Sequence, residues 1–227
     1  PIGESEKYKI ARDVYNKLVE ARGDYRYPEP KFTMLRTPTE GATMNYDSLE
    51  ITLEEKAYDV CASFGDQRNA ALAIILGHEL MHYYEKHGWR RSFAKSYQQL
   101  DIGMKLGGVV DDVIHETQAD YLGGFLAYSA GFGLFDQCPE LISRMYKAYN
   151  LPDTLSKYAT RQEREAMSTL TIRKLELLVD AFEVANLMTA CGNFEEARTY
   201  YQYVLRDYQS REIFNNVGVT ILLQVLK

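Results

Sequence analysis

The sequence predicts a mainly helical α+β protein that contains a small sheet and ends in a helical-hairpin repeat segment. Apolar residues recur at helical spacing over most of the 227 residues. Pro28, Pro30 and Pro38 interrupt this pattern and favour short extended pieces after them. From about residue 168 the pattern becomes that of stacked helix pairs. We therefore expect two parts, residues 1–167 and residues 168–227.

The first elements are expected to be a helix, two strands and a second helix. Residues 4–22 have an amphipathic helical pattern, and Gly23 is placed to end it. The stretch that follows is broken by proline and carries alternating apolar residues, which is typical of strands. The expected strands are residues 31–36 and 43–53, and the expected second helix is residues 54–64.

A longer, largely buried helix is expected over residues 66–87. The apolar run at residues 70–77 leads into it, and the segment contains no proline. Asp66 can cap its start and Gly88 can end it. Residues 78–82 read His-Glu-Leu-Met-His. Because buried ionisable groups cost free energy unless they are paired or bound to metal, this motif favours a metal site over an ordinary core helix.

The spacing within the motif supports the same interpretation. His78 and His82 are four residues apart, so on a helix both imidazoles point to one side and can share one ion. Zinc is the expected ion, because it accepts neutral imidazole nitrogens and an open coordination position activates a water molecule. Glu79 would remove the proton of that water. This chemistry hydrolyses peptide bonds, so the expected substrate is a protein or peptide.

A second helix, expected between Gly108 and Gly131, offers the third ligand. Glu116 and Asp120 are four residues apart within it and therefore share a face. Glu116 can complete a His-His-Glu site, and Asp120 can accept the remaining ring N–H of a ligand histidine, first of all His78. The alternative is a solvated acidic face, which is the ordinary fate of acidic residues.

Three segments together resemble the motifs of the gluzincin peptidases of the CAAX prenyl protease and HtpX type. They are residues 78–82, residues 116–120 (Glu-Thr-Gln-Ala-Asp) and residues 127–131 (Ala-Tyr-Ser-Ala-Gly), and the resemblance covers about residues 44–164. It implies a zincin-like metallopeptidase domain with a small sheet. Periplasmic members with fused tetratricopeptide repeats favour the cell envelope, while a cytoplasmic location stays open. The implied site is one zinc ion on His78, His82 and Glu116, with Glu79 as general base and Asp120 behind a ligand histidine.

One feature of that family is missing from the chain. Relatives usually carry a His-Pro pair ahead of an Arg near the end of the catalytic domain, and residues 158–163 lack it before Arg164. Another group must then stabilise the oxyanion. Tyr158 and His115 are candidates, because a phenol or an imidazolium can donate to developing negative charge. A packing or surface role for His115 is an equal alternative, and His87 is expected only to end its helix.

Two further segments are expected beside the site. In the resembled family, substrate lies along the edge of the small sheet as an added strand, so Asn45 and Tyr46 would lie near the cleft. Residues 98–106 predict a short helix. The three glycines between residues 103 and 108 predict either a lid or, more commonly, a plain turn between helices.

The last part of the chain has a repeat-like pattern. A helix over residues 169–190 is followed by residues 192–197 (Gly-Asn-Phe-Glu-Glu-Ala), which match the second helix of a tetratricopeptide repeat. Residues 214–221 fit the first helix of a further repeat. Because stacking usually needs several units, this segment either packs on the preceding domain or belongs to a longer array. Its apolar end favours truncation or a protein partner that covers it.

Composition excludes several other classes of protein. The net charge of −6 and a pI near 5.3 provide no basic surface for nucleic acid. The longest apolar run is about seven residues, well short of the roughly twenty needed for a transmembrane span. Cys61, Cys138 and Cys191 lack metal-type spacing and are expected to be buried small residues.

The function that competes with a peptidase is a non-catalytic or latent metal-binding scaffold. Such a protein would recruit a partner through its repeat-like helices.

Overall fold

The computed structural model describes residues 5–88, 112–152 and 161–226. Within these ranges the protein is mainly helical and carries one small sheet, which confirms the predicted α+β class. In chain order the elements are α1 (Glu6–Arg22), β1 (Lys31–Leu35), β2 (Ala42–Asn45), β3 (Glu50–Glu54), α2 (Glu55–Ala62), the 3₁₀ turn η1 (Gly65–Gln67), α3 (Arg68–Tyr84), α6 (Asp112–Ala127), the π-helical turn η2 (Tyr128–Phe132), α7 (Cys138–Tyr149), α8 (Arg161–Ala190), α9 (Phe194–Asp207) and α10 (Arg211–Leu226).

Helix α1 begins and ends close to its sequence signals. The Oγ of Ser5 accepts the N–H of Tyr8 at 3.2 Å, which satisfies a donor that the first helical turn leaves open. Gly23 ends the helix in the left-handed region, with φ 58°. Tyr15 stacks on Phe32 with 5.2 Å between the ring centroids, so α1 packs against β1.

The sheet has the strand order β1-β3-β2, with β1 parallel and β2 antiparallel to β3. The prediction of one strand over residues 43–53 is therefore wrong, because a turn divides it into β2 and β3. The Oδ1 of Asn45 accepts the N–H groups of Asp47 and Ser48 at 3.0 and 3.1 Å, and Leu49 has a φ of 53°. Such side-chain bonds to the local backbone favour a turn over an extended strand. Strand β2 lies at the edge of the sheet and contacts α3.

Helix α3 is shorter at both ends than the predicted range of residues 66–87. The 3₁₀ turn η1 precedes it, so Asp66 lies ahead of the helix and does not cap it. At the other end, Lys86 adopts a φ of 59° and turns the chain before Gly88 is reached. His87 consequently lies off the axis of α3, although it follows the motif closely in sequence.

Helices α6 and α7, which follow residue 111 in the chain, show how local signals set the ends of helices. The helix expected between residues 108 and 131 is α6, and the π-helical turn η2 continues it to a left-handed Gly131 with φ 83°. The sequence pattern did not predict α7. This helix has only 12 residues, starts beside Pro139 and ends at a left-handed Asn150 with φ 50°. Both signals are typical of helix ends, but the apolar pattern between them is short.

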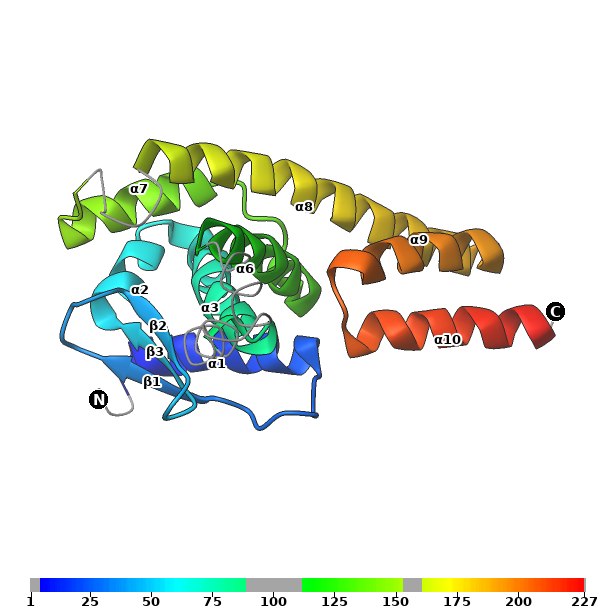
Figure 1. Ribbon diagram of the computed structural model, residues 1–227, viewed down its shortest axis with the longest axis horizontal. Coiled ribbons are helices and arrows are strands. Elements are labelled where there is room, and N and C mark those ends of the chain that lie inside the picture. Colours follow the sequence, from blue (N-terminus) through cyan, green and yellow to red (C-terminus); the bar gives the residue numbers. More distant parts are fainter. Residues whose placement is uncertain (1–4, 89–111, 153–160, 227) are drawn as a thin grey trace, which may run out of the picture.

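Helices α8, α9 and α10 follow one another as antiparallel neighbours (Figure 1). Helix α8 has 30 residues and starts at Arg161, ahead of the predicted start at residue 169. Figure 1 shows α7 beside the first part of α8 and α9 beside its last part. The domain boundary expected at residue 167 thus lies inside a helix. One cluster of buried apolar side chains runs from Ala11 in α1 to Ile213 in α10.

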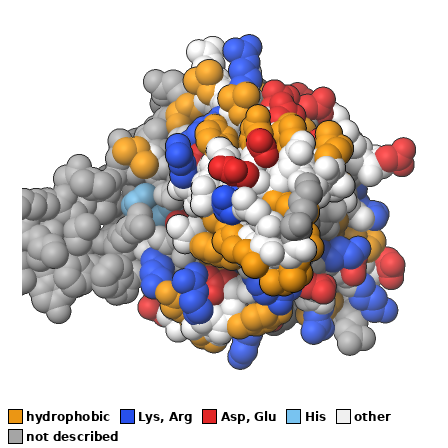
Figure 2. Space-filling model, turned by 90° about the vertical axis from the view of Figure 1, so that its right-hand side faces the viewer, with side chains coloured by type: hydrophobic (Ala, Val, Ile, Leu, Met, Phe, Trp, Pro, Cys, Tyr) orange, Lys and Arg blue, Asp and Glu red, His pale blue; other side chains and the backbone are white. Residues whose placement is uncertain are grey.

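Helix α10 exposes several large apolar side chains. Phe214, Leu222, Val225 and Leu226 of α10 are each more than half exposed. Figure 2 looks at the end of the molecule where α9 and α10 lie, and it shows hydrophobic side chains spread between charged ones. Over the described ranges, none of the helices combines the length and the apolar character that a membrane crossing requires.

Candidate metal centre

Helices α3 and α6 cross at a pair of glycines beside the metal motif. A Cβ on Gly77 would lie 2.8 Å from the carbonyl oxygen of Gly123, and a Cβ on Gly123 would lie 2.7 Å from the backbone nitrogen of His78. Both distances are too short for a side chain, so the two backbones are in contact. The sequence pattern did not predict this pair, although a glycine within an apolar helix is a usable signal of close packing. Ala119, one turn before Gly123 on α6, is fully buried.

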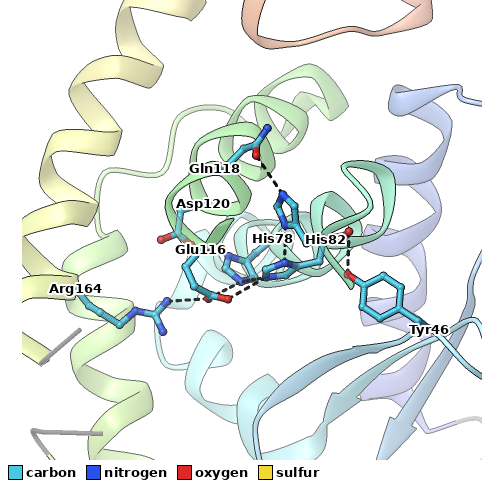
Figure 3. Close-up of polar contacts among 8 residues, drawn as sticks. Tyr46, His78, His82, Glu116, Gln118, Asp120 and Arg164 are labelled. Atoms are coloured by element: carbon cyan, nitrogen blue, oxygen red, sulfur yellow. Dashed lines mark hydrogen bonds and ion pairs between the residues drawn. The ribbon is translucent and has the colours of Figure 1, made fainter. Parts of the chain in front are cut away.

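This crossing brings three potential ligands together. The Nε2 atoms of His78 and His82 are 2.9 Å apart. Each of these nitrogens lies 3.4 Å from a carboxylate oxygen of Glu116 (Figure 3). One ligand atom from each residue lies within 4.8 Å of the other two, so the group could hold a metal ion. Two imidazole nitrogens and one carboxylate are a donor set that suits zinc.

Asp120 lies behind the first ligand histidine. Its Oδ1 is 2.7 Å from the Nδ1 of His78, on the opposite side of the ring from the nitrogen that faces Glu116. The carboxylate therefore holds a proton on Nδ1 and leaves the lone pair of Nε2 for a metal. This is the place that the sequence spacing predicted for Asp120.

Burial and charge act differently on these three side chains. Burial lowers the pKa of His82 to about 3, and the charge of His78 acts in the same direction. Burial alone would raise the pKa of Glu116, but a hydrogen bond from His78 and nearby positive charges lower it to about 2. Burial also lowers the pKa of His78, yet Asp120 and Glu116 raise it well above 6.5. A proton on His78 therefore competes with a metal ion for the site.

Glu79, the base predicted from the sequence, follows His78 on α3. It is partly buried. Burial raises the pKa of its carboxyl group, the charge of His78 lowers it, and a hydrogen bond from the backbone of Met44 also lowers it. Met44 belongs to β2, so Glu79 of α3 contacts the edge strand of the sheet.

Arg164 comes to the site from a distant part of the chain. Its Nη2 lies 3.7 Å from the Oε2 of Glu116, and Figure 3 shows it reaching that carboxylate from the side opposite Tyr46. The positive charge of Arg164 contributes to the lowered pKa of Glu116. Tyr158, the phenol considered as an oxyanion donor, lies outside the described residues, as do residues 98–108.

The remaining predicted residues have defined contacts. Tyr46 donates a hydrogen bond from its hydroxyl to the carbonyl oxygen of His82 at 2.9 Å, which ties the β2–β3 turn to α3. Asn45 uses its side chain within that turn. His115 is buried, and its ring stacks on the ring of His87 with 4.3 Å between centroids.

His87 has a closer relation to the site than the sequence suggested. It is buried, and its Nδ1 lies 2.8 Å from the Nδ1 of His82. The expectation that it only ends a helix is therefore wrong. A spacing of five residues would place two side chains on different faces of a continuous helix, but the left-handed Lys86 turns the chain back. All four histidines of the chain consequently lie in one cluster, which comprises His78, His82, His87 and His115.

Comparisons with protein-family models, curated proteins and solved structures find no match. The resemblance to gluzincin peptidases thus stays a prediction from three short motifs. A functional assignment depends on the arrangement of the side chains in the cluster.

Proposed function

We propose that this protein is a zinc-dependent endopeptidase of the gluzincin type. The observation that carries the proposal is the convergence of His78, His82 and Glu116 with a partly buried Glu79 beside them. A structural zinc site is normally closed by four protein ligands, whereas this group offers three among the described residues. Three ligands leave a coordination position for water or substrate, which favours a catalytic site.

In the proposed reaction, different residues would bind the metal and transfer the proton. When bound at His78, His82 and Glu116, zinc would supply Lewis-acid activation of a water molecule and of the scissile carbonyl group. Glu79 would take the proton of the attacking water at its carboxylate and deliver it to the leaving nitrogen. Partial burial supports both steps, because it raises the pKa of Glu79 toward the range in which a carboxyl group both accepts and returns a proton.

The edge of the sheet supports a peptide as the substrate. Among the described strands, β2 pairs with β3 alone, so an added strand would pair along its other edge. The bond from Met44 to Glu79 places this strand beside the base. An extended peptide paired to β2 would pass the ligand cluster with its backbone, which is how edge strands capture peptides. Asn45 and Tyr46, at the end of β2, would then lie beside one end of the bound peptide.

The C-terminal helices support a second, dependent part of the proposal. The antiparallel order of α8, α9 and α10 is that of stacked helical repeats, and the exposed apolar face of α10 suits a protein partner. We propose that this segment acts like tetratricopeptide repeats and recruits a partner protein. A location in the cell envelope remains an implication of the family resemblance.

Substitution of the base tests the enzymatic assignment. Glu79→Gln removes the base and leaves all three ligands, so it should retain zinc and lose hydrolysis of an unfolded protein such as casein. The matched control is Glu176→Gln, because Glu176 is exposed on α8. Zinc content is measured by atomic absorption and cleavage by gel electrophoresis. Full activity of Glu79→Gln would overturn the assignment. A wild-type protein that binds zinc without cleaving any substrate would favour the scaffold.

A further inference from the structure

We propose that His87 and Gln118 are positioning residues that hold His82 in the tautomer presenting its Nε2 to the metal. This inference rests on the proposed metal site, but it concerns a part of the cluster that neither the motifs nor the spacing identified. His78 has Asp120 behind its ring. His82 requires an equivalent partner, because a ligand imidazole with an unsatisfied second nitrogen would be poorly oriented.

A continuous chain of hydrogen bonds starts at the back of His82. Its Nδ1 lies 2.8 Å from the Nδ1 of His87. The Nε2 of His87 lies 3.2 Å from the Oε1 of Gln118, and the dashed line in Figure 3 marks this contact. The Nε2 of Gln118 then donates to the Oε2 of Glu85 at 3.4 Å. This series of hydrogen bonds links Glu85 and His87, which flank the left-handed Lys86, to Gln118 of α6.

The chemistry of these groups allows one arrangement of protons when His82 binds a metal. A ligand Nε2 must offer its lone pair, so the neutral His82 ring carries its proton on Nδ1 and donates it. The Nδ1 of His87 must then accept, which places the proton of a neutral His87 ring on Nε2. That N–H donates to the amide oxygen of Gln118, and the amide N–H of Gln118 donates to Glu85. Each hydrogen-bond donor in the series therefore faces an acceptor.

The far end of this chain is anchored by a buried cation. The Oε1 of Glu85 lies 3.7 Å from a guanidinium nitrogen of Arg22, which is only 4% exposed. The guanidinium group also lies over the rings of Tyr84 and Tyr208, at 5.1 and 5.2 Å from their centroids. The contact with Arg22 holds the Glu85 side chain in place as an acceptor, which sets the direction of the donors that precede it in the series.

The plane of the His87 ring is held separately. The ring of His115 stacks on it with an angle of 11° between the planes, and His115 is itself buried on α6. The stacking holds the plane in which Nδ1 of His87 faces His82 and Nε2 faces Gln118. This contact provides a role for His115 at the site that involves neither zinc nor substrate.

The two ligand histidines therefore have unlike partners. The partner of His78 is an aspartate, which carries negative charge, whereas the partner of His82 is a second imidazole. A carboxylate increases the basicity of the ring in front of it more strongly than a neutral acceptor does. We infer that the contribution of His87 is mainly to fix the tautomer and orientation of His82, and that its loss is felt in metal affinity.

The experiment measures zinc affinity by competition with a chromophoric chelator. His87→Phe keeps a ring for stacking on His115 but removes the acceptor, and zinc affinity should fall by about 10- to 100-fold. His87→Asn restores an acceptor near the position of Nδ1 and should recover most of the affinity. Gln118→Met leaves His87 in place and should give a smaller loss of the same kind. Thermal unfolding of each variant with chelator present separates affinity from stability.

A spectroscopic measurement tests the tautomer directly. In the zinc-loaded protein, two-dimensional ¹⁵N–¹H spectra of the imidazoles should show His82 protonated on Nδ1 and His87 protonated on Nε2. A His87 proton on Nδ1 would overturn the inference, as would wild-type affinity in both His87→Phe and Gln118→Met. If the wild-type protein binds no zinc, the proposed function itself fails, and this result is distinct from unchanged affinity in the variants.

Discussion

Gly77 and Gly123 bring α3 and α6 into backbone contact one residue before the first ligand histidine. A Cβ on Gly123 would meet the backbone nitrogen of His78 at 2.7 Å and the carbonyl carbon of Gly77 at 2.8 Å. The ligands on the two helices can share an ion because the helices approach this closely. The separation of His78 from Glu116 therefore depends on two residues that contribute no ligand atom.

Gly123→Ala should both destabilise the protein and weaken the metal site. The added methyl group meets backbone atoms that cannot rotate away, and such overpacking costs about 1–3 kcal/mol of the free energy of unfolding. Chemical denaturation measures this loss, and zinc titration should show weaker binding because Glu116 moves away from the histidines.

Two other glycines provide matched controls for this substitution. A Cβ on Gly124 would meet only the end of the flexible Leu175 side chain, so Gly124→Ala should cost less. Gly218 lies in α10 with no heavy atom within 4 Å of an added Cβ, and Gly218→Ala should stabilise the protein by about 0.5–1 kcal/mol. Equal effects of the three substitutions would contradict the close crossing of α3 and α6.

Asp120→Asn should weaken zinc binding without removing a ligand. The amide is nearly isosteric, but it lacks the charge that raises the pKa of His78 and orients its ring at 2.7 Å. Loss of such a partner typically lowers metal affinity by about 10- to 100-fold. Chelator competition measures the change, with Asp180→Asn on the exposed face of α8 as the control. Unchanged affinity would show that Asp120 does not support His78.

Glu54 should make the stability of the protein depend on pH. Its side chain is 3% exposed. Burial alone would raise the pKa of this carboxyl group, but hydrogen bonds from Tyr149, Thr39 and the N–H of Glu40 lower it below the ordinary value of 4.5. A lowered folded-state pKa contributes stability that is present above the unfolded pKa and is lost as the pH falls through the folded pKa.

Glu54→Gln tests this dependence. The substitution should lower the free energy of unfolding at pH 7 by about 1–3 kcal/mol, because donors that meet a buried carboxylate lose their acceptor. Urea denaturation across pH 7 to 3 should show the difference from wild type shrinking below about pH 4.5, where the wild-type carboxylate takes up its proton. A difference that stays constant over this range would assign the effect to packing alone.

Local spacing determined much of the site in advance. His78 and His82 share one face of α3, and Glu116 and Asp120 share one face of α6, because a separation of four residues is nearly one helical turn. The C-terminal end of α1 followed from Gly23 in the same way. These features depend on contacts within a few residues, which the order of the amino acids specifies.

Local turns that interrupt the apolar periodicity, together with contacts between distant segments, decided the rest. The chain changes direction at the Asn45 turn and at the left-handed Lys86, and α8 begins earlier than expected. The spacing of apolar residues does not predict these features. The sequence by itself determined which side chains can act as ligands and on which helical faces they lie. Only the tertiary structure decided that they meet, through backbone contact at Gly77 and Gly123, and that His87 stands behind His82, because both depend on helix packing in three dimensions.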